Sequence, residues 1–126
     1  MMGEGVGGQI EGFSAFWEER EDAAILRIRG DLDLSASAAL RACLLDEVGL
    51  SGPPIVLDLG EVPFVDSTCL GVLIAVMRHM QGPRGGLRLA AAQPRVQRAF
   101  EIAALEQMFP LFETVEEAAA AEPKAS

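Results

Sequence analysis

The sequence is poor in the residues that build metal sites and disulfide frameworks. Its 126 residues include two cysteines, Cys43 and Cys69, a single histidine, His79, and no tyrosine. No Cys-x-x-Cys pair is present, and a lone histidine supplies too few ligands for zinc. We therefore expect reduced thiols, no bound metal and no cofactor.

Basic residues and long hydrophobic runs are also scarce. Ten lysines and arginines stand against nineteen acids, giving a net charge of -9 and a pI near 4.5. This balance argues against nucleic-acid binding, which needs clustered cations. The longest apolar run, Cys69 to Met77 with Gly71 inside it, is about half the length of a membrane span. The start, Met1 to Gly5, lacks the basic and apolar regions of a secretory signal, which predicts a cytoplasmic protein without membrane insertion.

What is abundant indicates one packed domain. Hydrophobic residues make up 50% of the chain and charged residues 23%, with a mean hydropathy of +0.26. Residues 1–12 are glycine-rich, but they follow no strand and open no helix, so they predict a flexible tail rather than a phosphate-binding loop. We expect the domain to cover residues 13–121, followed by a frayed end at 122–126.

Hydrophobic periodicity places the elements. Alternating apolar residues at 13–17 and 24–29, separated by a charged turn, predict an antiparallel hairpin. The next residues predict a helix capped by Ser35 or Ser37 and ending near Gly49, and then an inner strand at 55–59 buried on both faces. A helix from 69 to about 80 and a strand at 87–91 follow. The last part of the chain predicts a helix opened by Gln93-Pro94, a short strand at 108–112, and a final helix behind a capping box at 114–117. The order ββαβαβαβα predicts a single-domain α/β fold, with a mixed sheet of about five strands and helices packed on one side.

The segment Val65-Asp66-Ser67-Thr68 stands directly before the second helix. The simplest interpretation is that one of its polar side chains caps the helix, which contributes about 1 kcal/mol. The helix that follows carries apolar residues all round, however, whereas a helix on one side of a sheet normally has a polar face. Either the fold covers its second face, or that face is an apolar partner surface beside Ser67.

Several segments, in this order and spacing, resemble the STAS domain, and more narrowly the anti-sigma factor antagonists of bacteria. The resemblance covers roughly residues 13 to 120. It is carried by Gly30-Asp31-Leu32-Asp33, Leu57-Asp58-Leu59, Phe64-Val65-Asp66-Ser67-Thr68 with Leu70-Gly71-Val72, Gly85-Gly86-Leu87, and the helix from Pro94 to Phe100.

The resemblance implies a regulatory switch. The unphosphorylated antagonist binds an anti-sigma factor, itself a serine kinase that carries the ATP, and so frees a sigma factor; phosphorylation then releases the antagonist. It implies that Ser67 is the phosphoacceptor and that the partner-binding residues are Asp31, Asp33, Asp66, Ser67, Thr68, Cys69 and Val72. A monomer or weak dimer is expected.

Cys69 departs from the resemblance, because the family usually has glycine at this position. Its side chain could crowd a close approach of the kinase. A thiol at a helix N-terminus could also be an oxidisable sensor, although a small packing residue is the simpler interpretation. Asp31 and Asp33 are candidates both for capping the first helix and for contacting the partner.

Other functions find less support in the sequence. Ser67 has no Gly-x-Ser-x-Gly context, and His79 lies about three helical turns beyond it, so we expect no enzyme activity. Arg95 and Arg98 suggest a solvated helix face rather than a phosphate site. The alternative function is a STAS subunit of a membrane transporter, or a signalling scaffold, without a phosphorylation switch.

Overall fold

The structure is a computed structural model that describes residues 9–10, 13–20, 22–44, 54–79, 86–105 and 109–121. Its elements are β1 (Gln9–Ile10), β2 (Phe13–Glu19), β3 (Ala24–Gly30), α1 (Leu34–Ala42), β4 (Ile55–Glu61), α2 (Ser67–His79), β5 (Leu87–Ala90), α3 (Pro94–Ile102), β6 (Leu111–Phe112) and α4 (Val115–Ala120). From β2 onward this is the predicted order, and the α/β fold class is confirmed.

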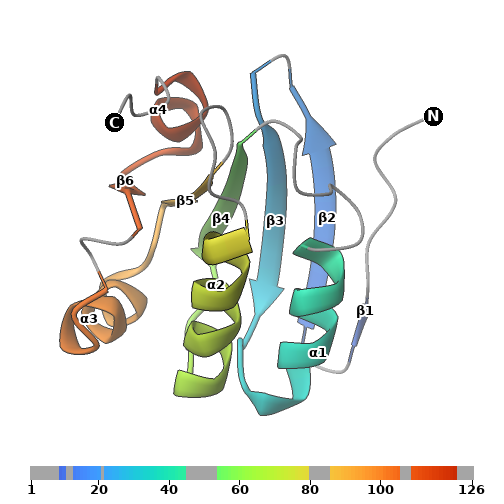
Figure 1. Ribbon diagram of the computed structural model, residues 1–126, viewed down its shortest axis with the longest axis vertical. Helices are drawn as coiled ribbons and strands as arrows, with labels where there is room; N and C mark the ends of the chain where they lie inside the picture. The colour runs from blue at the N-terminus through green and yellow to red at the C-terminus, as the bar shows by residue number, and fades with distance from the viewer. Residues whose placement is uncertain are drawn as a thin grey trace.

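The strands form one mixed sheet in the order β1-β2-β3-β4-β5-β6 (Figure 1). β1, β2 and β3 pair antiparallel, and each later strand joins its predecessor in parallel. The short strand β1 lies inside the segment for which the sequence predicts a flexible tail, and it adds a sixth strand at the edge.

Most of the core lies on one face of the sheet. Side chains at alternate positions of β2, β3, β4 and β5 pack there against apolar residues of α1, α2 and α3, among them Leu40, Leu73 and Phe100. Phe100 also meets Phe109 edge to face, with ring centroids 5.7 Å apart. This is the helix-covered face that the sequence predicts.

The fourth helix corrects the expectation that all helices pack on one side. Val115 and Ala118 of α4 pack with Ile25 and Val56 on the opposite face of the sheet. Arg88 of β5, itself buried, donates a hydrogen bond of 2.7 Å to the carbonyl of Ala118. The central strands are apolar on both faces, as the unbroken run at 55–57 indicates, so the second face also needs a cover.

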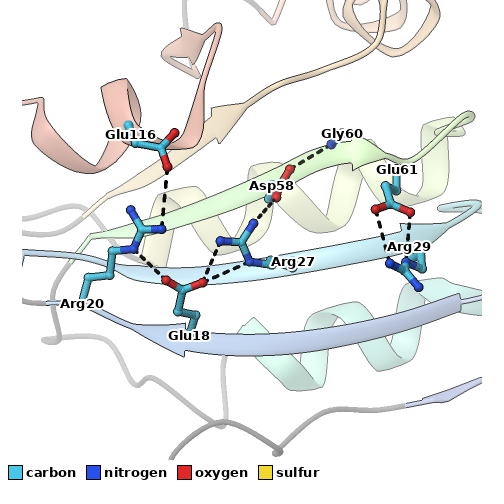
Figure 2. Close-up of polar contacts among 8 residues, drawn as sticks. All are labelled: Glu18, Arg20, Arg27, Arg29, Asp58, Gly60, Glu61 and Glu116. Atoms are coloured by element: carbon cyan, nitrogen blue, oxygen red, sulfur yellow. Dashed lines mark hydrogen bonds and ion pairs between the residues drawn. The ribbon is translucent and has the colours of Figure 1, made fainter.

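The face of the sheet that α4 packs on also carries a chain of ion pairs (Figure 2). Glu18 accepts from Arg27 at 2.7 Å, and Arg27 donates to Asp58 at 2.7 Å, which links β2, β3 and β4. Asp58 also accepts the backbone N–H of Gly60 at 3.0 Å, where β4 slips by one residue against β3. Asp58 therefore stabilises the bulge from which the chain leaves the sheet toward Ser67.

The helix caps differ in part from the predictions. Asp33, not Ser35 or Ser37, caps α1, because its Oδ1 accepts the backbone N–H of Ser35 at 3.1 Å. Each serine hydroxyl donates instead, Ser35 to Asp33 and Ser37 to the carbonyl of Leu34. The predicted cap by Thr114 is confirmed, because its hydroxyl accepts the N–H of Glu117 at 3.0 Å; this is one of the two bonds of the predicted capping box. The expected helix end near Gly49 lies outside the described residues.

Candidate functional site

The N-termini of α1 and α2 lie side by side at one end of the domain (Figure 1). They follow two neighbouring parallel strands, β3 and β4, so both helices start at the same edge of the sheet. The backbones of the two entry segments are bonded together there: Leu32 donates to the carbonyl of Phe64, and Asp66 donates to the carbonyl of Leu32, each at 2.9 Å. The candidate site is therefore built on two backbone segments that are distant in the sequence and hydrogen-bonded to each other.

Asp66 is the residue that caps α2. Its Oδ1 accepts the backbone N–H of Cys69 at 3.0 Å, and its carbonyl accepts the N–H of Leu70 at 3.0 Å. Ser67 and Thr68 are then the first two residues after the cap, and both are exposed. Within the described residues neither hydroxyl makes a hydrogen bond, so the structure separates the capping role from the two free hydroxyls.

Three carboxylates belong to the two helix entries at this end of the domain. Asp31 is exposed and Asp33 half-buried in the α1 entry, and Asp66 is half-buried in the α2 entry. The Ser35 hydroxyl, which donates to Asp33 at 2.7 Å, lowers the pKa of that carboxyl, so Asp33 carries its charge at neutral pH. None of the three acids forms an ion pair with another described residue. The site is therefore acidic.

Cys69 turns inward rather than toward a partner. It is completely buried, and its Sγ donates to the carbonyl of Asp33 at 3.2 Å, which joins the two helix entries. Burial, together with the charges of Asp66 and Asp33, raises the pKa of the thiol to about 12. The predictions that Cys69 contacts the partner, and that it could crowd the kinase or act as an oxidisable sensor, are therefore wrong: the side chain is a packing residue between the helices.

The fold itself covers most of the apolar surface of α2, so this surface is not an exposed apolar patch. Val72, Ile74 and Met77 are half-buried and pack against the main core cluster, and α1 packs along α2. No large apolar side chain of α2 is exposed in the part that the structure describes. Val72, predicted to bind the partner, therefore offers only part of its surface.

Two residues of this region were missed by reasoning from the sequence. Leu34, the first residue of α1, is 69% exposed, and Phe64, in the α2 entry, is 41% exposed. The available signal was Leu34 itself, an apolar residue in the first turn of a helix between two polar neighbours.

The remaining candidates lie away from this site. His79 ends α2, at the opposite end of the helix from Ser67, and Arg95 and Arg98 are exposed on α3. Across the described residues no group of three histidines, cysteines or acids is placed to hold a metal ion. No helix in those residues is long and apolar enough to cross a bilayer.

Comparisons with known proteins identify the family to which this fold belongs. The model of the STAS domain family matches residues 17–118. BtrV of Bordetella bronchiseptica, a candidate anti-sigma factor antagonist, is 31% identical over 75% of this chain and 81% of its own length. The crystal structure of an anti-sigma factor antagonist from Mycobacterium paratuberculosis superposes with a TM-score of 0.75 at 26% identity, covering 84% of this chain and 90% of that one.

A further solved structure shares the fold at lower identity. The antagonist SpoIIAA, in its unphosphorylated form, has a TM-score of 0.67 at 23% identity and covers 82% of this chain and 91% of its own. SpoIIAA has also been solved in a phosphorylated form. With the family model matching most of its length, this chain belongs to the STAS domain family, and the relatives it resembles are anti-sigma factor antagonists.

Proposed function

We propose that the chain is a cytoplasmic anti-sigma factor antagonist that is switched off by phosphorylation of Ser67. In its unphosphorylated form it binds an anti-sigma factor serine kinase and so frees a sigma factor. The observation that carries the proposal is the Ser67 hydroxyl, which is exposed at the start of α2 and is not needed as a cap, because Asp66 fills that role.

The domain itself is suited to carry a phosphate at this position. Phosphorylation adds about 1.5 to 2 negative charges. The free N–H groups and the dipole at the N-terminus of α2 favour an anion there. Asp66 and Asp33 oppose it, but the modified side chain is exposed and hydrated. We therefore expect the fold to survive phosphorylation with little change in stability.

Binding responds differently, because a partner packed over Ser67 has to remove water from the phosphate. Burying such a group against apolar surface without full compensation costs about 3 kcal/mol or more, which is about a hundredfold or more in affinity. Release then needs no conformational change in the antagonist. Asp31, Asp33 and Thr68 lie at the same end of the domain and are proposed to contact the partner together with Ser67.

The names of the relatives support a binding protein rather than an enzyme. BtrV is named a candidate anti-sigma factor antagonist, and the Mycobacterium paratuberculosis protein is named an anti-sigma factor antagonist. Asp66 and Asp33 each accept a backbone N–H as helix caps, and His79 lies at the other end of α2 from Ser67.

The test is to incubate the protein with Mg-ATP and each anti-sigma serine kinase encoded in the same genome. Intact-mass and peptide mass spectrometry then locate any phosphate, and Ser67→Ala and Thr68→Ala are the matched controls. We expect one phosphate on the wild type and on Thr68→Ala and none on Ser67→Ala. We also expect the phosphorylated protein to lose affinity for its kinase in calorimetry.

Two results would overturn the proposal. Phosphate on Thr68 instead of Ser67 would show that the proposal names the wrong hydroxyl as the phosphoacceptor. No modification by any kinase, with the wild-type protein folded, would favour the transporter-subunit or scaffold function, which needs no phosphoacceptor.

A further inference from the structure

Gly71 lies one helical turn after Ser67 on α2 and is exposed. A Cβ atom added to it would meet no neighbouring atom within 4 Å, so among the described residues no contact requires a glycine there. Glycine is the least favourable helix-interior residue after proline, because it loses the most backbone entropy on folding. Gly71 is therefore an exposed residue that lowers the stability of the helix that begins with Ser67.

Two exposed apolar side chains lie at the same end of the domain. Leu34 and Ser67 occupy the same position, the first residue after the cap, in two helices that start side by side (Figure 1). Phe64 belongs to the entry segment whose carbonyl accepts the N–H of Leu32 at 2.9 Å. Four large apolar side chains are exposed among the described residues, and these two flank the site. Exposed apolar side chains that gather on one surface mark a place where a protein partner can pack.

The charges around these two side chains indicate what covers them. Asp31, Asp33 and Asp66 have no cationic partner among the described residues, and the whole chain has a net charge of -9. A second copy of this chain would bring the same acids against them, which disfavours self-association through this face. A partner with an apolar centre and a cationic rim complements the surface.

We infer that Leu34, Phe64 and the bare backbone at Gly71 form one docking surface around Ser67 for an apolar, cation-rimmed segment of the kinase. This rests on the proposed function and adds the partner's chemistry and its points of contact. The apolar centre packs over Ser67, and its atoms approach the helix at Gly71 more closely than a methyl group would allow. Phosphate on Ser67 would then lie under the apolar centre, out of reach of the cations at the rim.

The test uses Gly71→Ala, which separates stability from binding. Because alanine favours the helix, we expect the melting temperature to rise by about 3–6 °C. We also expect the affinity for the kinase that modifies the wild type to fall at least about tenfold, measured by calorimetry with a non-hydrolysable ATP analogue. Leu34→Ser and Phe64→Ser should each weaken binding about tenfold or more. The matched control is Ile102→Ser, which alters a 78% exposed apolar residue on α3 and should change affinity less than about twofold.

Each outcome decides a different point. If Gly71→Ala and the two serine variants bind and are phosphorylated like the wild type, the docking surface is wrong while the phosphorylation switch stands. If Ile102→Ser weakens binding as much as they do, the surface does not lie around Ser67. If no kinase modifies even the wild type, the proposed function fails, and the occupant inferred here fails with it.

Discussion

The substitution Asp66→Ala tests whether Asp66, rather than Ser67 or Thr68, caps α2. The substitution removes the acceptor that holds the Cys69 N–H at 3.0 Å, a loss of about 1 kcal/mol for a helix cap. It also removes a negative charge from the positive end of the helix dipole, about another 0.5 kcal/mol. We therefore expect the free energy of unfolding to fall by about 1.5 kcal/mol.

Three matched variants separate these contributions. Asp66→Asn keeps an acceptor oxygen and loses only the charge, so it should cost about 0.5 kcal/mol. Ser67→Ala and Thr68→Ala remove exposed hydroxyls that bond to nothing else described, and each should change stability by less than about 0.5 kcal/mol.

Urea unfolding can be followed by the fluorescence of Trp17, the single tryptophan, which is 6% exposed in the folded core. With a denaturant slope of about 1–3 kcal/mol per molar urea, the Asp66→Ala midpoint should fall by about 0.5–1.5 M. The reasoning is refuted if Ser67→Ala or Thr68→Ala lowers the midpoint as much as Asp66→Ala does, because that hydroxyl would then be the structural group.

Three other measurements test the packing and the charges. In the folded protein at pH 8, alkylation of Cys43, which is half-buried, should be faster than that of Cys69, whose pKa is raised to about 12; equal rates would contradict the burial of Cys69. Phe100→Ala should lower the free energy of unfolding by about 3–5 kcal/mol in the same urea assay, and a loss below about 1 kcal/mol would mean that the ring is not part of the core. Hydrogen bonds from its two arginine partners lower the pKa of Glu18 below 4.5, so its contribution is present above pH 4.5 and is lost as the pH falls through the folded-state pKa. Glu18→Gln should therefore flatten the acid limb of stability against pH, and an unchanged limb would rule out this contribution.

Much of the fold could be predicted because local signals agree along the chain. Alternation of apolar residues marks β2 and β3, an unbroken apolar run marks the centre of β4, and Pro94 marks the start of α3. The packing of α4 was harder to predict, because a six-residue helix has too little periodicity to show which face of the sheet it covers. Its place depends on apolar positions of β3 and β4 that lie far away in the sequence.

The candidate site also has features that local sequence determines and features that depend on long-range contacts. The sequence by itself determined that Asp66, Ser67 and Thr68 stand at the start of a helix after an inner strand, because residue types and spacing are local properties. The cap by Asp66 is also local, a bond across three residues. Only the tertiary structure decided that Cys69 faces inward, toward the carbonyl of Asp33. The exposure of Leu34 and Phe64 beside Ser67 was also decided there. These facts depend on which surfaces meet when β3 and β4 pair and bring two helix starts together, and burial is a property of such long-range contacts rather than of any residue's own chemistry.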